Sequence, residues 1–163
     1  AIEQTDLVVS RGTGPAPAGA VQDPRHPAMG WRVYGPTDQS DDTDWTALRV
    51  AHLIPETGTE LTEDTYVLEA GFEALNGVDF KKGCFVGQEI VARMKHKTTL
   101  KKGIAQVHIE GSPAVGDPIT ADGKPVGTLY SIAGDKGLAF LRFDRAEVMM
   151  QAGNATLTRL NAN

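Results

Sequence analysis

The sequence predicts an α+β fold that ends in a small antiparallel β-barrel or sandwich. Two observations lead to this prediction. Up to about residue 98, segments with strand or helix character alternate with glycine- and proline-containing loops. From about Leu100, short β-type runs follow one another, separated by turn residues such as Asp122-Gly123 and Gly153-Asn154. We therefore expect an α+β domain over residues 1–98 and a small β-barrel domain over residues 99–163.

The first elements are read from alternation and from turn residues. Leu7–Ser10 is expected to form a strand that enters a long glycine- and proline-rich loop over residues 12–27, an irregular surface excursion. Trp31–Tyr34 alternates in character and is expected to return to a sheet.

A helix is predicted next. Asp41–Asp44 supply capping side chains and negative charge for a helix that begins near Trp45 and that Pro55 should end. Tyr66–Phe72 is compatible with a strand or a helix, and Asn76-Gly77 marks a tight turn.

The second predicted helix follows the glycine-rich turn at Cys84. It covers Gln88–Lys95, with Glu89 near its positive end and a buried stripe formed by Ile90, Val91 and Met94.

Four β-type runs are expected in the last part of the chain: Ile104–Ile109, Val126–Ile132, Leu138–Phe143 and Ala155–Leu160.

The composition is that of an ordinary folded protein. Hydrophobic residues make up 40% and charged residues 23% of the 163 residues, which argues against disorder. No apolar run approaches the roughly 20 residues that cross a bilayer. The acidic first residues do not resemble a signal peptide, so we expect a cytoplasmic protein. With one cysteine and four histidines that lack metal-binding spacing, we expect no metal site.

The net charge of −5 is unevenly distributed. Residues 81–102 contain seven basic residues and one acid, a net charge of +6, and the remainder carries −11. Such a strip suits an anionic partner, but charge alone favours the alternative of a solvated surface whose lysines pair with nearby acids.

Cys84 lies in a setting that differs from that of a core cysteine. Lys81 and Lys82 precede it, Gly83 and Gly87 flank it, and a helix N-terminus is expected to follow. Cations and a helix N-terminus both favour the reactive thiolate. The alternative is a small, buried and unreactive cysteine, as lone cysteines usually are.

The segment Lys82–Glu89, followed by Arg93, resembles the pattern K-G-C-[FY]-x-G-Q-E-x3-R of the YgfZ family. The likeness continues upstream. Asp23-Pro24-Arg25 and Gly30-Trp31-Arg32 resemble the family's D-P-R and G-W-R segments, and Leu68-Glu69-Ala70 resembles an L-E-A segment shared with the glycine-cleavage T protein.

Two features depart from the family pattern. Arg49 with Ile54–Glu56 resembles its R…G-[IV]-P-E element, but Leu53 stands at the glycine position. Family members also carry a substantial part before the D-P-R segment, so we expect this chain to lack an N-terminal part.

The resemblance implies a T-protein-like fold, with ferredoxin-like α+β domains followed by a small barrel. It also implies a tetrahydrofolate-binding accessory protein that supports the assembly or repair of iron–sulfur enzymes and, through them, tRNA modification. The expected partners are therefore folate and iron–sulfur client or assembly proteins. Direct binding of nucleic acid is not expected, because Phe85 is the only aromatic residue in the basic strip.

The same resemblance assigns roles to particular residues. Cys84 and Lys82 are the expected functional residues of the pattern, and Glu69 matches a glutamate that holds the pterin in T-protein relatives. The other expected folate contacts are Lys101, Lys102, Gln88, Glu89 and Arg93. A plain surface carboxylate at Glu69 and surface lysines at the two lysine positions are the alternatives. The alternative function is that of a folate-dependent aminomethyltransferase.

Overall fold

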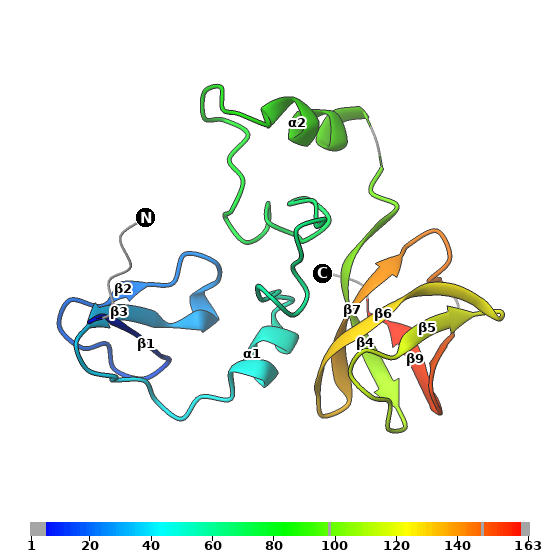
Figure 1. Cartoon of the computed structure of the whole chain (residues 1–163), viewed down its shortest axis with the longest axis horizontal. Coiled ribbons are helices and arrows are strands. Elements are labelled where there is room, and N and C mark those ends of the chain that lie inside the picture. The colour runs from blue at the N-terminus through cyan, green and yellow to red at the C-terminus, as the bar shows by residue number, and fades with distance from the viewer. Residues whose placement is uncertain (1–5, 98, 148, 161–163) are drawn as a thin grey trace.

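The computed structural model describes residues 6–97, 99–147 and 149–160. It contains a small three-stranded sheet, a six-stranded closed barrel and two α-helices (Figure 1). Figure 1 shows the sheet and the barrel at opposite ends, with helix α1 between them and helix α2 apart from both. The α+β class with a C-terminal barrel is therefore confirmed.

The N-terminal sheet has the strand order β1-β3-β2, and both pairs are antiparallel. Its strands are β1 (Val8–Gly12), β2 (Val21–Gln22) and β3 (Trp31–Gly35). A short 3-10 helix, η1 (Pro27–Met29), precedes β3. The predicted loop over residues 12–27 is thus more ordered than expected, because β2 pairs with β3 and the turn after it buries Asp23.

Helix α1 (Trp45–Ala51) begins as predicted, with the Asp44 side chain accepting a hydrogen bond from the backbone N–H of Ala47. It packs against the barrel through a small apolar cluster of Val50, Ile104 and Leu138. Tyr66–Phe72 forms neither a strand nor a helix but a series of turns. Helix α2 (Gln88–Lys97) covers the second predicted helix and extends it by two residues.

The barrel closes in the order β4-β7-β6-β5-β8-β9, and all its pairs are antiparallel. Its strands are β4 (Lys102–Glu110), β5 (Pro118–Ala121), β6 (Lys124–Ala133), β7 (Lys136–Arg142), β8 (Met150–Ala152) and β9 (Ala155–Arg159). The four predicted runs correspond to β4, β6, β7 and β9. The short strands β5 and β8 were not predicted, and they complete a barrel instead of a sandwich.

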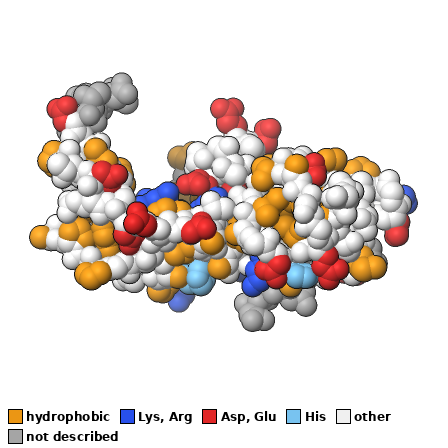
Figure 2. Space-filling model, turned by 90° about the horizontal axis from the view of Figure 1, so that it is seen from below, with side chains coloured by type: hydrophobic (Ala, Val, Ile, Leu, Met, Phe, Trp, Pro, Cys, Tyr) orange, Lys and Arg blue, Asp and Glu red, His pale blue; other side chains and the backbone are white. Residues whose placement is uncertain are grey.

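The main hydrophobic core fills this barrel, with fully buried side chains such as Val107, Leu129, Leu141 and Leu157. Figure 2 shows acidic side chains spread along the face seen from below and hydrophobic side chains exposed towards both ends. The boundary predicted between residues 98 and 99 falls at Thr98, which lies outside the described residues, and the first barrel strand begins at Lys102.

Candidate functional site

Glu69 is held at the junction between the turn segment and the barrel. Its backbone carbonyl accepts a hydrogen bond from the N–H of Ile104, at 2.8 Å. Gly103 allows this approach, because a Cβ atom at that position would lie 2.7 Å from the same carbonyl oxygen. The Glu69 side chain is only 7% exposed. The alternative of a plain surface carboxylate is therefore wrong.

Glu69 lines a pocket of about 240 Å³ at this junction. Leu53, Leu68 and Phe143 contribute apolar walls. Within the described residues, Glu69 Oε2 has no hydrogen-bond partner, and Lys102 Nζ lies 3.6 Å from it. Buried polar atoms are normally hydrogen-bonded in native proteins, so such an oxygen suits a ligand that donates hydrogen bonds.

Arg159 closes the same pocket. Its guanidinium lies 4.1 Å from the centre of the Phe143 ring, and its buried Nε has no hydrogen-bond partner in the described part of the chain. The pocket thus combines apolar walls with an acceptor on one residue and a donor on another. Sequence reasoning missed Arg159, because nothing in its local context distinguishes it from a surface arginine.

Of the other residues predicted to contact folate, Lys102 is the one whose side chain pairs with Glu69 in the described part of the chain. Lys101 has an exposed side chain, and its backbone carbonyl accepts a hydrogen bond from the Phe143 N–H. The other three predicted contacts, Gln88, Glu89 and Arg93, lie on α2, and no residue of α2 lines the Glu69 pocket.

Cys84 lies in an exposed turn that leads into α2. Gly87 has a φ of +86°, a backbone conformation that glycine adopts without strain. The Gln88 side chain accepts a hydrogen bond from the Phe85 N–H at 3.3 Å, and the Gln88 N–H donates to the Phe85 carbonyl. These reciprocal bonds hold the turn closed and leave the thiol outside, so the alternative of a buried cysteine is wrong.

Exposed apolar side chains follow this thiol in the chain. Phe85 is 37%, Ile90 56% and Val86 102% exposed. The prediction that Ile90, Val91 and Met94 form a buried stripe is therefore wrong for Ile90, while Val91 and Met94 are half-buried. The physical reason is that α2 packs extensively against no other helix or strand in the described part of the chain.

The basic residues of the strip are partly neutralised. Arg93 pairs with Glu89 at 3.2 Å, Lys95 with Glu73 at 2.6 Å, and Lys102 with Glu69. Lys82 Nζ lies 4.6 Å from the centre of the Phe85 ring, so its charge lies within the same turn as Cys84. The basic residues of the strip over residues 81–102 thus lie on a turn, a helix and a strand, and several of their charges are paired.

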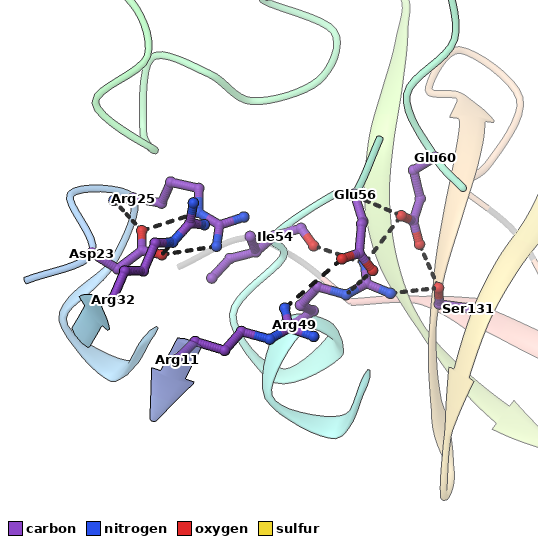
Figure 3. Close-up of polar contacts among 9 residues, drawn as sticks. All are labelled: Arg11, Asp23, Arg25, Arg32, Arg49, Ile54, Glu56, Glu60 and Ser131. Carbon is purple, nitrogen blue, oxygen red and sulfur yellow. Dashed lines mark hydrogen bonds and ion pairs between the residues drawn. The ribbon is translucent and has the colours of Figure 1, made fainter. Parts of the chain in front are cut away.

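A second polar cluster lies beside the N-terminal sheet (Figure 3). The Asp23 side chain is 1% exposed and accepts hydrogen bonds from Arg25 and from Arg32 Nε, the latter at 2.7 Å. Burial alone would raise the pKa of Asp23, but the hydrogen bonds and charge of Arg25 and the charge of Arg32 lower that pKa to about 2. The carboxylate therefore holds both guanidinium groups in fixed positions.

A third cluster connects α1 to the barrel. Arg49 donates to Glu60 at 3.1 Å and to Ser131 of strand β6 at 3.3 Å, and Ser131 donates to the other oxygen of Glu60 (Figure 3). All three side chains are buried. The sequence offered no signal for this network, because Arg49 and Ser131 are 82 positions apart.

No group of three or more His, Cys, Asp or Glu side chains within the described residues has an arrangement suited to a metal ion. The helices of the described residues also include none that is long and apolar enough to cross a membrane.

Comparison with known proteins gives consistent matches. Residues 101–161 match the family model described as the CAF17 C-terminal beta-barrel domain. The chain is 33% identical to the mitochondrial iron–sulfur cluster assembly factor IBA57 of Mus musculus, over 75% of this chain and 39% of that protein. It is 32% identical to the tRNA-modifying protein YgfZ of Aliivibrio fischeri, over 48% of this chain and 26% of that protein.

A third relative is a putative chloroplastic transferase of Arabidopsis thaliana, 33% identical over 64% of this chain and 25% of that protein. The chain spans less than half the length of each of these relatives.

Proposed function

Because this chain belongs to the IBA57/YgfZ family, we propose that it is the part of an iron–sulfur cluster assembly factor that holds the pterin of tetrahydrofolate and presents a working thiol. The observation that carries the proposal is the buried Glu69 carboxylate, whose Oε2 has no hydrogen-bond partner among the described residues, in a pocket with several apolar walls. The link to tRNA modification, through iron–sulfur enzymes, belongs to the same proposal.

The residues of the Glu69 pocket fit one end of the cofactor. A carboxylate accepts two parallel hydrogen bonds, the pattern that an aminopyrimidinone ring donates. The pocket, at about 240 Å³, is smaller than the roughly 300–1,000 Å³ of sites for whole drug-sized ligands. It therefore suits the pterin ring, with Leu68 and Phe143 excluding water around it. Lys102 would neutralise the Glu69 carboxylate while that carboxylate orients the ring.

Tetrahydrofolate, when bound, supplies a carrier of one-carbon units. The contribution of this chain is to bind and orient it. The predicted contacts Lys101, Lys102, Gln88, Glu89 and Arg93 do not line the pocket, and of these only Lys102 pairs with Glu69, so a direct role of all five in binding folate stays a prediction about the complete protein.

Cys84 supports the second half of the proposal, together with Lys82. The thiol is exposed shortly before α2, and exposed apolar side chains follow it in the chain. An exposed apolar surface of this kind is typical of a contact site for another protein. We infer that the Cys84 turn contacts an iron–sulfur client or assembly protein.

Folate binding is tested by titrating tetrahydrofolate into the complete gene product that carries this chain. We expect Glu69→Gln to weaken binding at least tenfold, because the amide cannot accept both ring hydrogen bonds. Glu110→Gln, at an exposed glutamate of β4, is the matched control. Unchanged affinity in Glu69→Gln would exclude the pocket, and no binding by the natural protein would exclude the folate proposal.

The thiol is tested in cells that lack the protein. We expect Cys84→Ser to bind folate normally and to fail to restore iron–sulfur enzyme activity at equal protein levels. Measured one-carbon transfer to or from an aminomethyl-lipoyl carrier by the purified protein would instead establish an aminomethyltransferase. Cell fractionation tests the predicted cytoplasmic location.

A further inference from the structure

A second pocket, of about 440 Å³, shares no lining residue with the Glu69 pocket. Its walls come from the two arginines beside the N-terminal sheet, from the segment Pro55–Leu61, and from the turns that contain Phe72 and Gly77. Its volume falls within the range of small-molecule sites.

Asp23 holds the two arginines at one side of this pocket. Arg25 donates to both carboxylate oxygens through Nε and a terminal amino group, at 3.0 and 2.9 Å. Arg32 uses only its Nε, at 2.7 Å. Figure 3 shows the two guanidinium groups close together beside the single carboxylate. The single negative charge of Asp23 is thus shared by the positive charges of two arginines.

The terminal amino groups of Arg32 have no hydrogen-bond partner among the described residues, although the side chain is only 32% exposed and lines the pocket. An arginine whose Nε is held by a carboxylate presents its other two nitrogens as a fixed fork. Such a fork matches two oxygens of a phosphate or a carboxylate.

Glu56 lines the same pocket, but its charge is compensated. It lies 3.2 Å from Arg49 Nε and 3.9 Å from Arg11, and Arg49 also pairs with buried Glu60. The four arginines (Arg11, Arg25, Arg32, Arg49) face three carboxylates (Asp23, Glu56, Glu60), so the cluster has a net charge of +1. The field at the pocket therefore favours an anion.

The remaining walls are mostly apolar, with Pro55, Leu61, Phe72 and Leu75 as the main contributors. An inorganic anion alone would leave these surfaces without contact. A flat hydrophobic group beside the anion would bury them and pack against the Phe72 ring.

We propose that this pocket binds a small organic oxyanion, with a phosphate or carboxylate held by the Arg25–Arg32 pair and an aromatic body against Phe72. The alternative is an ion triad that only stabilises the sheet. The free fork of Arg32 and the adjoining apolar cavity distinguish the two, because a purely structural triad requires neither.

The test uses phenyl phosphate and benzoate, titrated into the complete protein and followed by isothermal calorimetry. Inorganic phosphate serves as the anion without a ring, and benzyl alcohol as the ring without an anion. We expect at least one of the two organic anions to bind at least tenfold more tightly than inorganic phosphate and than benzyl alcohol. Equal affinity for inorganic phosphate, or no binding of either organic anion at millimolar concentration, would overturn the proposal.

Variants locate the site. Arg32→Gln should weaken binding at least tenfold, and Arg32→Lys should weaken it less, because the charge remains while the fork is lost. Thr57→Trp fills the pocket from an exposed position and leaves the Asp23 pairs intact, so loss of binding in this variant does not depend on the triad. Arg142→Gln, an exposed arginine paired with Asp144 on the barrel, is the matched control.

The proposal is separable from folate binding. Glu69→Gln should leave the affinity for the organic anion unchanged, and Thr57→Trp should leave the affinity for tetrahydrofolate unchanged. Unaltered binding of the organic anion in both Arg32→Gln and Thr57→Trp would place it elsewhere and overturn the assignment.

Discussion

Asp23 illustrates how one buried residue can organise a surface. Its carboxylate is almost fully buried, yet it stays ionised because two arginines surround it. The unfavourable free energy of burying this charge is offset by its hydrogen bonds to charged donors, which are shorter and stronger than hydrogen bonds between neutral groups. The Asp23-Pro24-Arg25 segment was noticed in the sequence only as a resemblance. Its role requires Arg32, which lies across a strand pair and cannot be placed from local sequence.

We expect Asp23→Asn to lower the free energy of unfolding by about 1–2 kcal/mol at pH 7, allowing for the partial exposure of both arginines. The pKa of Asp23 is lowered from 3.8 to about 2 in the folded protein. The stabilisation is therefore complete above pH 4 and is lost as the pH falls towards 2. Denaturant unfolding at pH 7, 4 and 2.5 measures this. A difference between the two proteins that does not shrink below pH 4 would contradict the ion pairs.

The backbone at Leu53 and at Gly103 shows what sequence can and cannot provide. Leu53 has a φ of +55°, where the YgfZ-family pattern has glycine, so the mismatch in the sequence marked a real left-handed residue. Gly103 gave no such signal. It is needed because the Glu69 carbonyl lies directly above it, and that contact joins residues 34 positions apart.

We expect Gly103→Ala to destabilise the protein by about 1–3 kcal/mol, since the added methyl group would overlap the Glu69 carbonyl oxygen and must displace it. The displacement should also weaken tetrahydrofolate binding. Thermal unfolding and folate titration measure the two effects. Gly35→Ala is the control, because a Cβ atom there meets nothing within 4 Å. Equal effects of the two substitutions would mean that Gly103 acts through backbone entropy alone.

At the scale of elements, prediction succeeded where a segment carries its own pattern. Helix α1 has an aspartate cap and a proline after it, and four of the barrel strands have the alternation and length of ordinary strands. Strands β5 and β8 are too short for such a pattern and are defined by pairing with each other and with their neighbours. The 66–72 segment forms turns closed by its own backbone hydrogen bonds, such as that from the Ala70 N–H to the Tyr66 carbonyl, and the Ile104 N–H of β4 bonds to its Glu69 carbonyl.

Helix α1 and the barrel are joined by the buried Arg49–Glu60–Ser131 network. We expect Glu60→Gln to cost about 1–3 kcal/mol in the free energy of unfolding, because Arg49 and Ser131 lose a buried carboxylate partner while Glu56 still compensates the Arg49 charge. The double variant Arg49→Met with Glu60→Met should recover part of this loss by removing both charges. Denaturant unfolding of the natural protein, the single variant and the double variant measures these free energies. If Glu60→Gln were as stable as the natural protein, the carboxylate of Glu60 would not be needed to hold Arg49, and Glu56 would be a sufficient partner.

The Cys84 turn and α2 differ from α1 and the barrel strands, because several of their apolar side chains are exposed at the surface. We expect Val86→Glu to leave stability and folate binding unchanged, since Val86 is fully exposed, and to abolish support of iron–sulfur enzymes in cells. Val115→Glu is the matched control, an exposed valine in a barrel loop. If both variants support these enzymes as well as the natural protein, the Cys84 turn does not use this surface to contact a partner.

At the scale of the whole molecule, the sequence predicted that an α+β part precedes a barrel. It did not predict which residues of the two parts pack against each other. The barrel has its own core, while Ile104 and Leu138 of the barrel are covered by Val50 of α1. The Glu69 pocket also lies across this junction. A pocket formed between two parts of a chain depends on their packing. Glu69 was predicted because Leu68-Glu69-Ala70 resembles a segment of the family pattern, whereas only the packing places Arg159 at this pocket.

The barrel should fold without the rest of the chain. We expect a fragment of residues 99–163 to unfold cooperatively, because its central core is formed entirely by residues of β4–β9 and the turns between them. It should be less stable than the complete protein, since removal of the preceding residues, α1 and Glu60 among them, exposes Ile104, Leu138 and Ser131 and takes away the partners of that serine. Circular dichroism and the dispersion of amide resonances measure this. Adding Ile104→Thr and Leu138→Thr to the fragment should improve its solubility and leave its fold intact. A collapsed fragment without dispersed resonances would show instead that the packing of α1 is required for the barrel to close.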